Sequence, residues 1–204
     1  GVFQVVLGKS SQIGSEMLEN PICRNISFTG STPVGKGLIE GAAKTCTMLS
    51  LELGGNAPVI VFADADFDLA IEGTLMAKFR NTGQSCIAAN RVYVERPIYE
   101  TFLEAFTERV QQQKVGPGLE EGVVIGAMID EAALQDALKM IDEAVKLGAR
   151  LLCGGQRWGD QGSFLTPTVM ADVPDEAHCM NEEIFAPVAS VVIAVNRAID
   201  RLYP

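Results

Sequence analysis

The sequence has little of what several classes of protein require. It contains only one histidine, His178, and only one tryptophan in 204 residues. No apolar run approaches the roughly 20 residues needed to cross a bilayer, and the first residues lack the charged flank, apolar core and small-residue cleavage site of a signal peptide. We therefore expect no membrane partner.

Cysteine is scarce, and its spacing matches no disulfide or zinc framework. The five cysteines are odd in number, widely scattered and without a C-x-x-C pair. This pattern argues against a disulfide scaffold and against a metal site, and it favours a reducing cytoplasm. We interpret four of the five as small apolar residues within the fold. The five are Cys23, Cys46, Cys86, Cys153 and Cys179.

Basic residues are outnumbered by acidic ones. The chain has 16 Lys and Arg against 26 Asp and Glu, which gives a formal net charge of −10. Nucleic acids and anionic membranes attract clustered basic residues, so we expect neither as a partner. With 48% hydrophobic and 21% charged residues, the composition is that of an ordinary globular protein. Its length allows one domain, or one domain and part of another.

Strand-like and helix-like stretches alternate through most of the chain. This order predicts an α/β fold with largely parallel strands. A double glycine after residue 53 interrupts the pattern, which makes it the one plausible domain boundary. We expect strands near residues 25–29, 47–53, 58–62, 91–95, 149–155, 166–173 and 188–195, and helices near 33–44, 67–79, 97–110 and 131–147.

The segment FTGSTPVG, residues 28–35, joins a predicted strand to a predicted helix. Gly30 and Gly35 flank the turn, where free backbone N–H groups and the positive helix end can hold a phosphate, and Ser31 adds a hydroxyl. A glycine turn of this kind is more often purely structural. The segment also lacks the G-x-G-x-x-G spacing of the usual dinucleotide fingerprint.

The segment LELGGNAP, residues 51–58, places Glu52 at the end of an apolar strand beside two glycines. If Glu52 were buried there, its pKa would rise and it would suit general-base work near neutral pH. The alternative is a strand-end glutamate that faces water, and the sequence favours neither.

The segment FRNTGQSCIAANRVYV, residues 79–94, carries Cys86 in a small polar loop between a helix and a strand. A thiol in such a loop can be reachable, and nearby backbone N–H groups can lower its pKa and stabilise an oxyanion. Taken alone, a cysteine is more often a buried apolar residue.

Together with NEEIFAP at residues 181–187, these segments resemble, in their order and separation, the aldehyde dehydrogenase superfamily. The resemblance covers nearly the whole chain and implies an aldehyde-dehydrogenase-like α/β fold, with Cys86 as the nucleophile and Glu52 as the general base. It also implies a set of residues that contact the cofactor, NAD or NADP. These are Gly30, Ser31 and Gly35 at the phosphates, Leu53 at the nicotinamide amide, and Glu183 and Phe185 at the nicotinamide ribose and ring.

The resemblance is strongest to the succinate-semialdehyde dehydrogenase branch, through LELGGNAPVIVF, KFRNTGQSC and GARLLCGG. In that branch, the arginine that matches Arg80 binds the carboxylate of the substrate, which implies a carboxylated aldehyde as the substrate here. The alternative is a surface arginine at a helix end. The position two residues after Cys86 is Ala88, so we expect none of the redox switching that a second cysteine would permit.

The resemblance also implies how this chain is organised. Residues 1–52 would be the C-terminal part of an NAD(P)-binding domain, and residues 53–204 a truncated catalytic domain, in a longer protein that forms a dimer or tetramer. Residues 196–204 depart from the expected continuation.

Two alternatives to an active dehydrogenase of this kind stay open, namely an inactive fragment of such an enzyme and a dehydrogenase for another aldehyde. A cysteine hydrolase is disfavoured, because it would need a histidine base and His178 lies in a polar connecting segment.

Overall fold

The computed structural model describes residues 1–194, so residues 196–204, which the sequence analysis singled out, lie outside the described residues. The chain divides into two compact units, Gly1–Gly54 and Gly55–Pro204. The motifs are shared between them, with FTGST and Glu52 in the smaller unit and Cys86 and NEEIFAP in the larger one.

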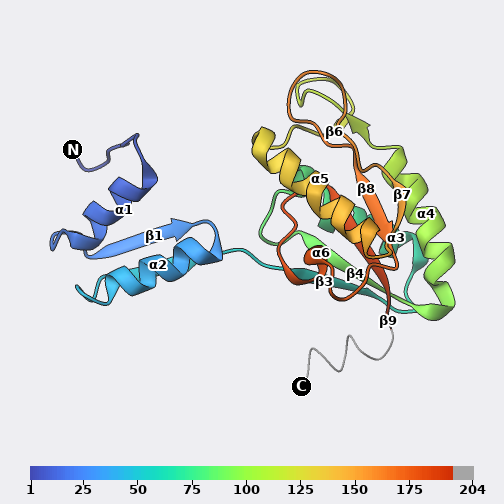
Figure 1. The fold of residues 1–204 in the computed structure, drawn as a ribbon, viewed down its shortest axis with the longest axis horizontal. Helices are drawn as coiled ribbons and strands as arrows, with labels where there is room; N and C mark the ends of the chain where they lie inside the picture. Colours follow the sequence, from blue (N-terminus) through green and yellow to red (C-terminus); the bar gives the residue numbers. More distant parts are fainter. Residues whose placement is uncertain (195–204) are drawn as a thin grey trace. The chain divides into compact units, whose positions relative to one another are not determined.

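The smaller unit is built on one parallel strand pair (Figure 1). Helix α2 connects the two strands, as a parallel pair requires, and Pro33 lies in its first turn, where the missing N–H costs nothing. Asn25 pairs with Met48 and Thr29 with Glu52, so the turn before α2 and the end of the second strand lie at the same edge. The elements are α1 (Ser10–Glu19), β1 (Asn25–Thr29), α2 (Thr32–Ala42) and β2 (Met48–Glu52).

The larger unit contains a five-stranded sheet with the order β3-β4-β9-β8-β7. Its first four strands run parallel, and only β7 is antiparallel to its neighbour β8. This arrangement confirms the α/β class with largely parallel strands. The strands are β3 (Ala57–Val61), β4 (Ala89–Glu95), β7 (Arg150–Cys153), β8 (Thr168–Ala171) and β9 (Val188–Ala194), and β5 (Lys114–Val115) pairs separately with β6 (Val123–Ile125).

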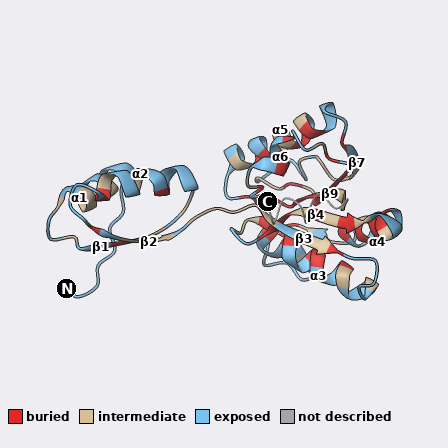
Figure 2. Ribbon diagram, turned by 90° about the horizontal axis from the view of Figure 1, so that it is seen from below, coloured by how far each residue is buried: buried red, intermediate tan, exposed pale blue. Residues whose placement is uncertain are grey.

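Helices cover both faces of this sheet, giving three layers (Figure 2). On one face, α3 (Phe67–Phe79) and α4 (Tyr99–Gln111) bury a core in which the rings of Phe102 and Phe106 stack with centroids 5.4 Å apart. On the other face, α5 (Glu131–Lys146) and the short α6 (His178–Asn181) bury a second core. Single-turn helices η1 (Arg80–Gly83) and η2 (Arg96–Ile98) complete the unit.

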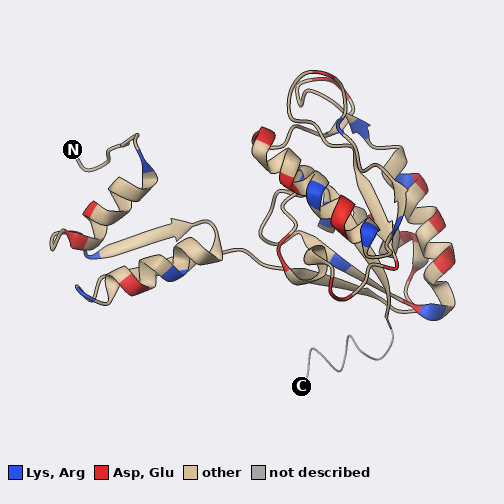
Figure 3. Ribbon diagram, in the orientation of Figure 1, with Lys and Arg blue, Asp and Glu red and all other residues tan. Residues whose placement is uncertain are grey.

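Acidic residues recur along α4 and α5, with a few basic residues among them (Figure 3). Glu100, Glu104 and Glu108 recur every four residues along α4, and all three are exposed. This spacing keeps the carboxylates on the side of the helix away from the core. Within residues 1–194, no helix combines the length and the apolar character needed to cross a membrane.

Candidate active site

The backbone just before Cys86 adopts a conformation that is rare for residues with a side chain. Asn81 and Thr82 have φ values of 53° and 58°, and Gly83 follows with φ 70°. Each non-glycine residue in this left-handed region costs about 1–3 kcal/mol, and such strain gathers at functional sites. The turn redirects the chain out of α3, and Cys86 is exposed three residues later.

Side-chain hydrogen bonds hold this turn against the segment that follows β6. The hydroxyl of Thr82 accepts from the backbone N–H of Gly126 at 2.9 Å. The amide of Gln84 donates to the carbonyl of Ala127 at 3.1 Å and accepts from the N–H of Ile129 at 2.9 Å. The loop that presents Cys86 is therefore anchored on both sides of Gly83.

Two glycines let three of the motifs meet within the larger unit. A Cβ placed on Gly83 would lie 2.2 Å from the carbonyl oxygen of Ala186, so the backbone of NEEIFAP packs directly on this turn. A Cβ on Gly55 would lie 3.0 Å from the carbonyl oxygen of Cys86. Only glycine combines the positive φ of residue 83 with such a close approach.

Glu183 and Phe185 lie in the segment that packs on the Cys86 loop. Glu183 is half-buried, and its Oε1 accepts from the backbone N–H of Gly55 at 3.3 Å. Among the described residues, its Oε2 has no hydrogen-bond partner, so it is available to a ribose hydroxyl. Phe185 is 47% exposed, so its ring is available to contact a ligand ring. These residues fit the nicotinamide half of a dinucleotide.

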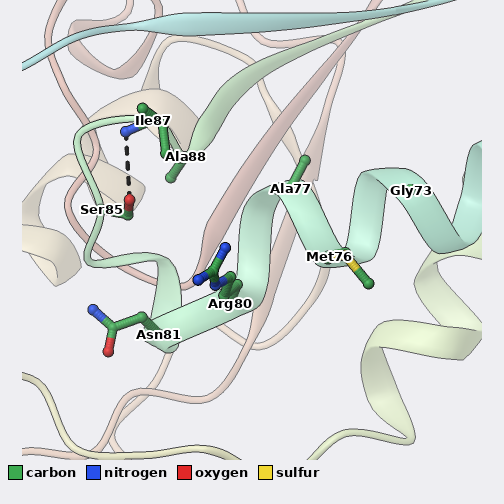
Figure 4. A pocket seen from close by; sticks show the side chains of 8 residues that line it. All are labelled: Gly73, Met76, Ala77, Arg80, Asn81, Ser85, Ile87 and Ala88. Atoms are coloured by element: carbon green, nitrogen blue, oxygen red, sulfur yellow. Dashed lines mark hydrogen bonds between the residues drawn. The ribbon is translucent and has the colours of Figure 1, made fainter.

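Arg80 lines a cavity of about 760 Å³ beside the Cys86 loop. Figure 4 shows its side chain between the end of α3 and the loop that carries Ser85 and Ile87. Ser85 and Ile87 flank Cys86 and also line this cavity, and the hydroxyl of Ser85 accepts from the N–H of Ile87 at 3.4 Å. No ion pair joins Arg80 to a carboxylate within residues 1–194, so its guanidinium can meet an anion.

The smaller unit carries the predicted phosphate-binding turn. Ser31 is the N-cap of α2 but makes no capping hydrogen bond with its side chain, which leaves both its hydroxyl and the first N–H groups of the helix available. The N–H of Gly30 donates to the carbonyl of Glu52 at 3.0 Å, which joins this turn to the end of β2. The arrangement fits a phosphate at the helix end.

The other two predicted residues of this unit lie beside the turn. The side chain of Leu53 packs against Gly35, where a Cβ would lie 2.6 Å from Leu53 Cδ2. Glu52 is exposed at the end of β2. Of the two alternatives for Glu52, the structure therefore shows the one in which the carboxylate faces water.

The other cysteines and the single histidine differ in how far they are exposed. Cys179 is buried, and burial raises the pKa of its thiol and that of Cys153, which makes both unreactive. The interpretation of four cysteines as residues within the fold is wrong for Cys46, which is exposed. His178 is exposed as expected, but it begins α6 rather than lying in a loop.

Lys78 and Asn90, both fully buried in the larger unit, were not predicted from the sequence. The Nζ of Lys78 donates to Oδ1 of Asn90 at 2.9 Å. A signal was present, because Lys78 follows Ile71 and Thr74 at the i+7 and i+4 positions of the buried face of α3. A charged residue at an apolar position of a helix is a candidate for function.

Comparison with known proteins points to one family. A family model described as "Aldehyde dehydrogenase family" matches residues 1–198. The succinate-semialdehyde dehydrogenase [NADP(+)] of Escherichia coli (strain K12) is 48% identical over 189 residues, which are 93% of this chain and 39% of that protein. The 3-sulfolactaldehyde dehydrogenase of Pseudomonas putida is 50% identical over the same shares.

A solved structure gives the same result at the level of the fold. The crystal structure of succinate-semialdehyde dehydrogenase from Burkholderia pseudomallei superposes with a TM-score of 0.93 at 42% identity, and the match covers 97% of this chain and 41% of that one. The chain thus spans about two fifths of the length of the relatives it matches.

Proposed function

Because this chain belongs to the aldehyde dehydrogenase family, we propose that it is part of a longer NAD(P)-dependent enzyme that oxidises an aldehyde to a carboxylic acid. The observation that carries the proposal is the exposed Cys86, held on an anchored turn against the segment that bears Glu183. An exposed thiol, on a turn that packs against the segment carrying Glu183 and Phe185, provides the parts of a covalent oxidation site.

The residues divide the chemistry into two steps. The thiolate of Cys86 adds to the carbonyl carbon of the aldehyde, and the resulting thiohemiacetal loses hydride to become a thioester. NAD or NADP supplies the hydride acceptor when bound. Glu52 is the general base that the family resemblance implies, and its exposed carboxylate would take a proton from a water molecule. The water oxygen then attacks the thioester, and the carboxylic acid leaves as the thiolate of Cys86 re-forms. No histidine is needed.

The cofactor contacts follow from the local geometry of each unit. The turn at Gly30, the hydroxyl of Ser31 and Gly35 would hold the cofactor phosphates at the start of α2, and Leu53, which packs against Gly35, would approach the nicotinamide amide. Glu183 would accept hydrogen bonds from ribose hydroxyls through its available oxygen, and Phe185 would contact the nicotinamide ring. These assignments serve NAD and NADP equally well.

Arg80 points to the class of substrate. The names of two relatives give succinate semialdehyde and 3-sulfolactaldehyde as their substrates. Both compounds carry an anionic group at the end opposite the aldehyde. A guanidinium in the cavity next to Cys86 would bind that anion and direct the aldehyde toward the thiol. We infer succinate semialdehyde or a similar carboxylated aldehyde as the substrate.

The same family membership supports the organisation of the whole protein. We infer that residues 1–52 belong to the NAD(P)-binding domain and residues 53–204 to the catalytic thiol domain. The chain matches only 39% of its relatives' length, in agreement with a segment of a larger enzyme. We propose that the complete enzyme acts in the cytoplasm as a homo-oligomer.

The test is an assay of the complete enzyme for formation of NADH and NADPH with succinate semialdehyde. Cys86→Ala should reduce turnover to background, because no other group forms the thioester. Cys46→Ala, at the other exposed cysteine, is the matched control and should keep full turnover. Turnover that survives Cys86→Ala would refute the nucleophile, and so would a thiol-labelling rate at Cys86 no faster than at Cys153.

A further inference from the structure

A closed ring of hydrogen bonds joins α3, β4, the double-glycine segment and the Glu183 segment. The ammonium of Lys78 donates to Oδ1 of Asn90 at 2.9 Å and to the carbonyl of Ile184 at 3.4 Å. The side-chain amide of Asn90 donates to the carbonyl of Gly55 at 3.3 Å. The N–H of Gly55 donates to Oε1 of Glu183 at 3.3 Å, and the peptide between Glu183 and Ile184 closes the ring.

Packing alone does not explain a lysine at this position. Lys78 and Asn90 have no exposed surface, and a buried ammonium is costly unless it is paired and hydrogen-bonded. The neighbours of Lys78 on the same face of α3, Ile71 and Leu75, are apolar. An apolar residue at position 78 would therefore complete the core without the free-energy cost of burying an ammonium group. The charge of Lys78 therefore serves a purpose other than packing.

We propose that Lys78 is a positioning residue for cofactor binding, holding Glu183 and the Gly55 segment where the carboxylate can accept the ribose hydroxyls. The inference rests on the proposed function, because it takes Glu183 as the ribose ligand. Lys78 acts through Glu183 and the backbone, and it touches neither cofactor nor substrate.

The charge of Lys78 makes the strength of these hydrogen bonds depend on pH. Burial lowers the pKa of Lys78 to about 7, and the negative charge of Glu183 opposes the shift. The other groups that face the ammonium are the neutral amide of Asn90 on β4 and the backbone carbonyl of Ile184. When Lys78 loses its proton, both hydrogen bonds lose their charge assistance and Glu183 loses its counter-charge. Cofactor affinity should therefore fall as pH rises through about 7.

The experiment measures the dissociation constant of NADH and of NADPH for the complete enzyme by fluorescence titration, from about pH 6 to about pH 9. The wild-type constant should rise about tenfold across this range, a change of about 1.4 kcal/mol. Lys78→Met keeps the unbranched shape and most of the length of the side chain without its charge, so its dissociation constant should be raised at every pH and show no inflection. Lys146→Met, at an exposed lysine of α5, should match the wild type.

Asn90→Asp gives a second measurement, which does not depend on the folding of the Lys78 variant. A carboxylate beside the ammonium favours its charged form, so the inflection should move to higher pH. In a Glu183→Gln background, Lys78→Met should add little, because the lysine acts through the carboxylate.

The outcomes separate the two proposals. An enzyme that binds neither nucleotide contradicts the proposed function. Nucleotide binding with a flat wild-type profile, an inflection that Asn90→Asp leaves in place, or one that Lys78→Met retains would overturn the role of Lys78 alone.

Discussion

At the scale of single residues, the role proposed for Arg80 predicts a preference for a carboxylated aldehyde over a simple one. Arg80→Gln in the complete enzyme should raise KM for succinate semialdehyde by about 10²-fold, because a charge-assisted bidentate bond to the substrate is lost. KM for butanal, which has the same carbon chain without the carboxylate, should change little. Steady-state kinetics with both aldehydes measures the difference.

Arg96→Gln is the matched control for Arg80, since Arg96 is also an exposed arginine beside a short helical turn. It should leave both KM values unchanged. An equal rise in KM for both aldehydes in Arg80→Gln would show that the arginine supports the loop rather than the substrate.

Lys78 also makes a prediction about stability. Its pKa is about 7 in the folded protein and 10.5 in the reference state, so between these values the unfolded chain binds a proton that the folded chain does not. The free energy of unfolding should therefore rise with pH in this window, by at most about 1.4 kcal/mol per pH unit. Denaturant unfolding of wild type and Lys78→Met at several pH values should show this rise in the wild type alone. If the two proteins gave the same dependence of the free energy of unfolding on pH, the lowered pKa of Lys78 would be wrong.

At the scale of elements, one glycine in α3 and one in the turn that follows it should change the stability of the protein in opposite directions when each is replaced by alanine. Gly73→Ala lies in the helix with open space around its new Cβ, so it should stabilise the protein by about 0.5–1 kcal/mol. Gly83→Ala should destabilise it by more than about 1 kcal/mol, because residue 83 has positive φ and meets Ala186.

The two glycine variants serve as each other's controls, since each adds one methyl group to the same stretch of chain. Denaturant midpoints would measure the change in stability, and turnover would report the displacement of the Cys86 loop. If Gly83→Ala were as stable as the wild type, the close packing of NEEIFAP on this turn would be wrong.

At the scale of the whole molecule, the smaller unit has few buried apolar side chains. Within residues 1–54, the buried apolar side chains are those of Ile26 and Ala42, and a cavity of about 720 Å³ lies open along α1, β1 and α2. So few buried side chains contribute little hydrophobic stabilisation. The larger unit, in contrast, has two extensive cores.

The isolated 204-residue chain should therefore be inactive. We expect its residues 1–54 to exchange their backbone amide protons rapidly, while the strands β4, β8 and β9 stay protected. Hydrogen exchange followed by mass spectrometry, together with the aldehyde assay, tests both statements. Cys86-dependent turnover by the isolated chain would contradict the first, and slow exchange throughout residues 1–54 the second.

The sequence alone predicted most of the long strands and helices and proposed Cys86 as the nucleophile, whereas α1, β5, β6 and α6 were not predicted. Alternating hydrophobic periods identified β1, α3 and α5, because helix and strand periodicity is a local property of the chain. The order of the motifs around Gly30, Glu52 and Cys86 indicated the family, because short chemical motifs are also local in sequence.

Only the tertiary structure revealed what holds those parts together. The ring from Lys78 to Asn90, Gly55 and Glu183 joins positions up to 128 residues apart, and the approach of Gly83 to Ala186 spans a similar distance along the chain. Nothing in the local pattern encodes such pairs. They arise because β4 and β9 are parallel neighbours in the sheet, so the loops that precede the two strands lie at the same edge.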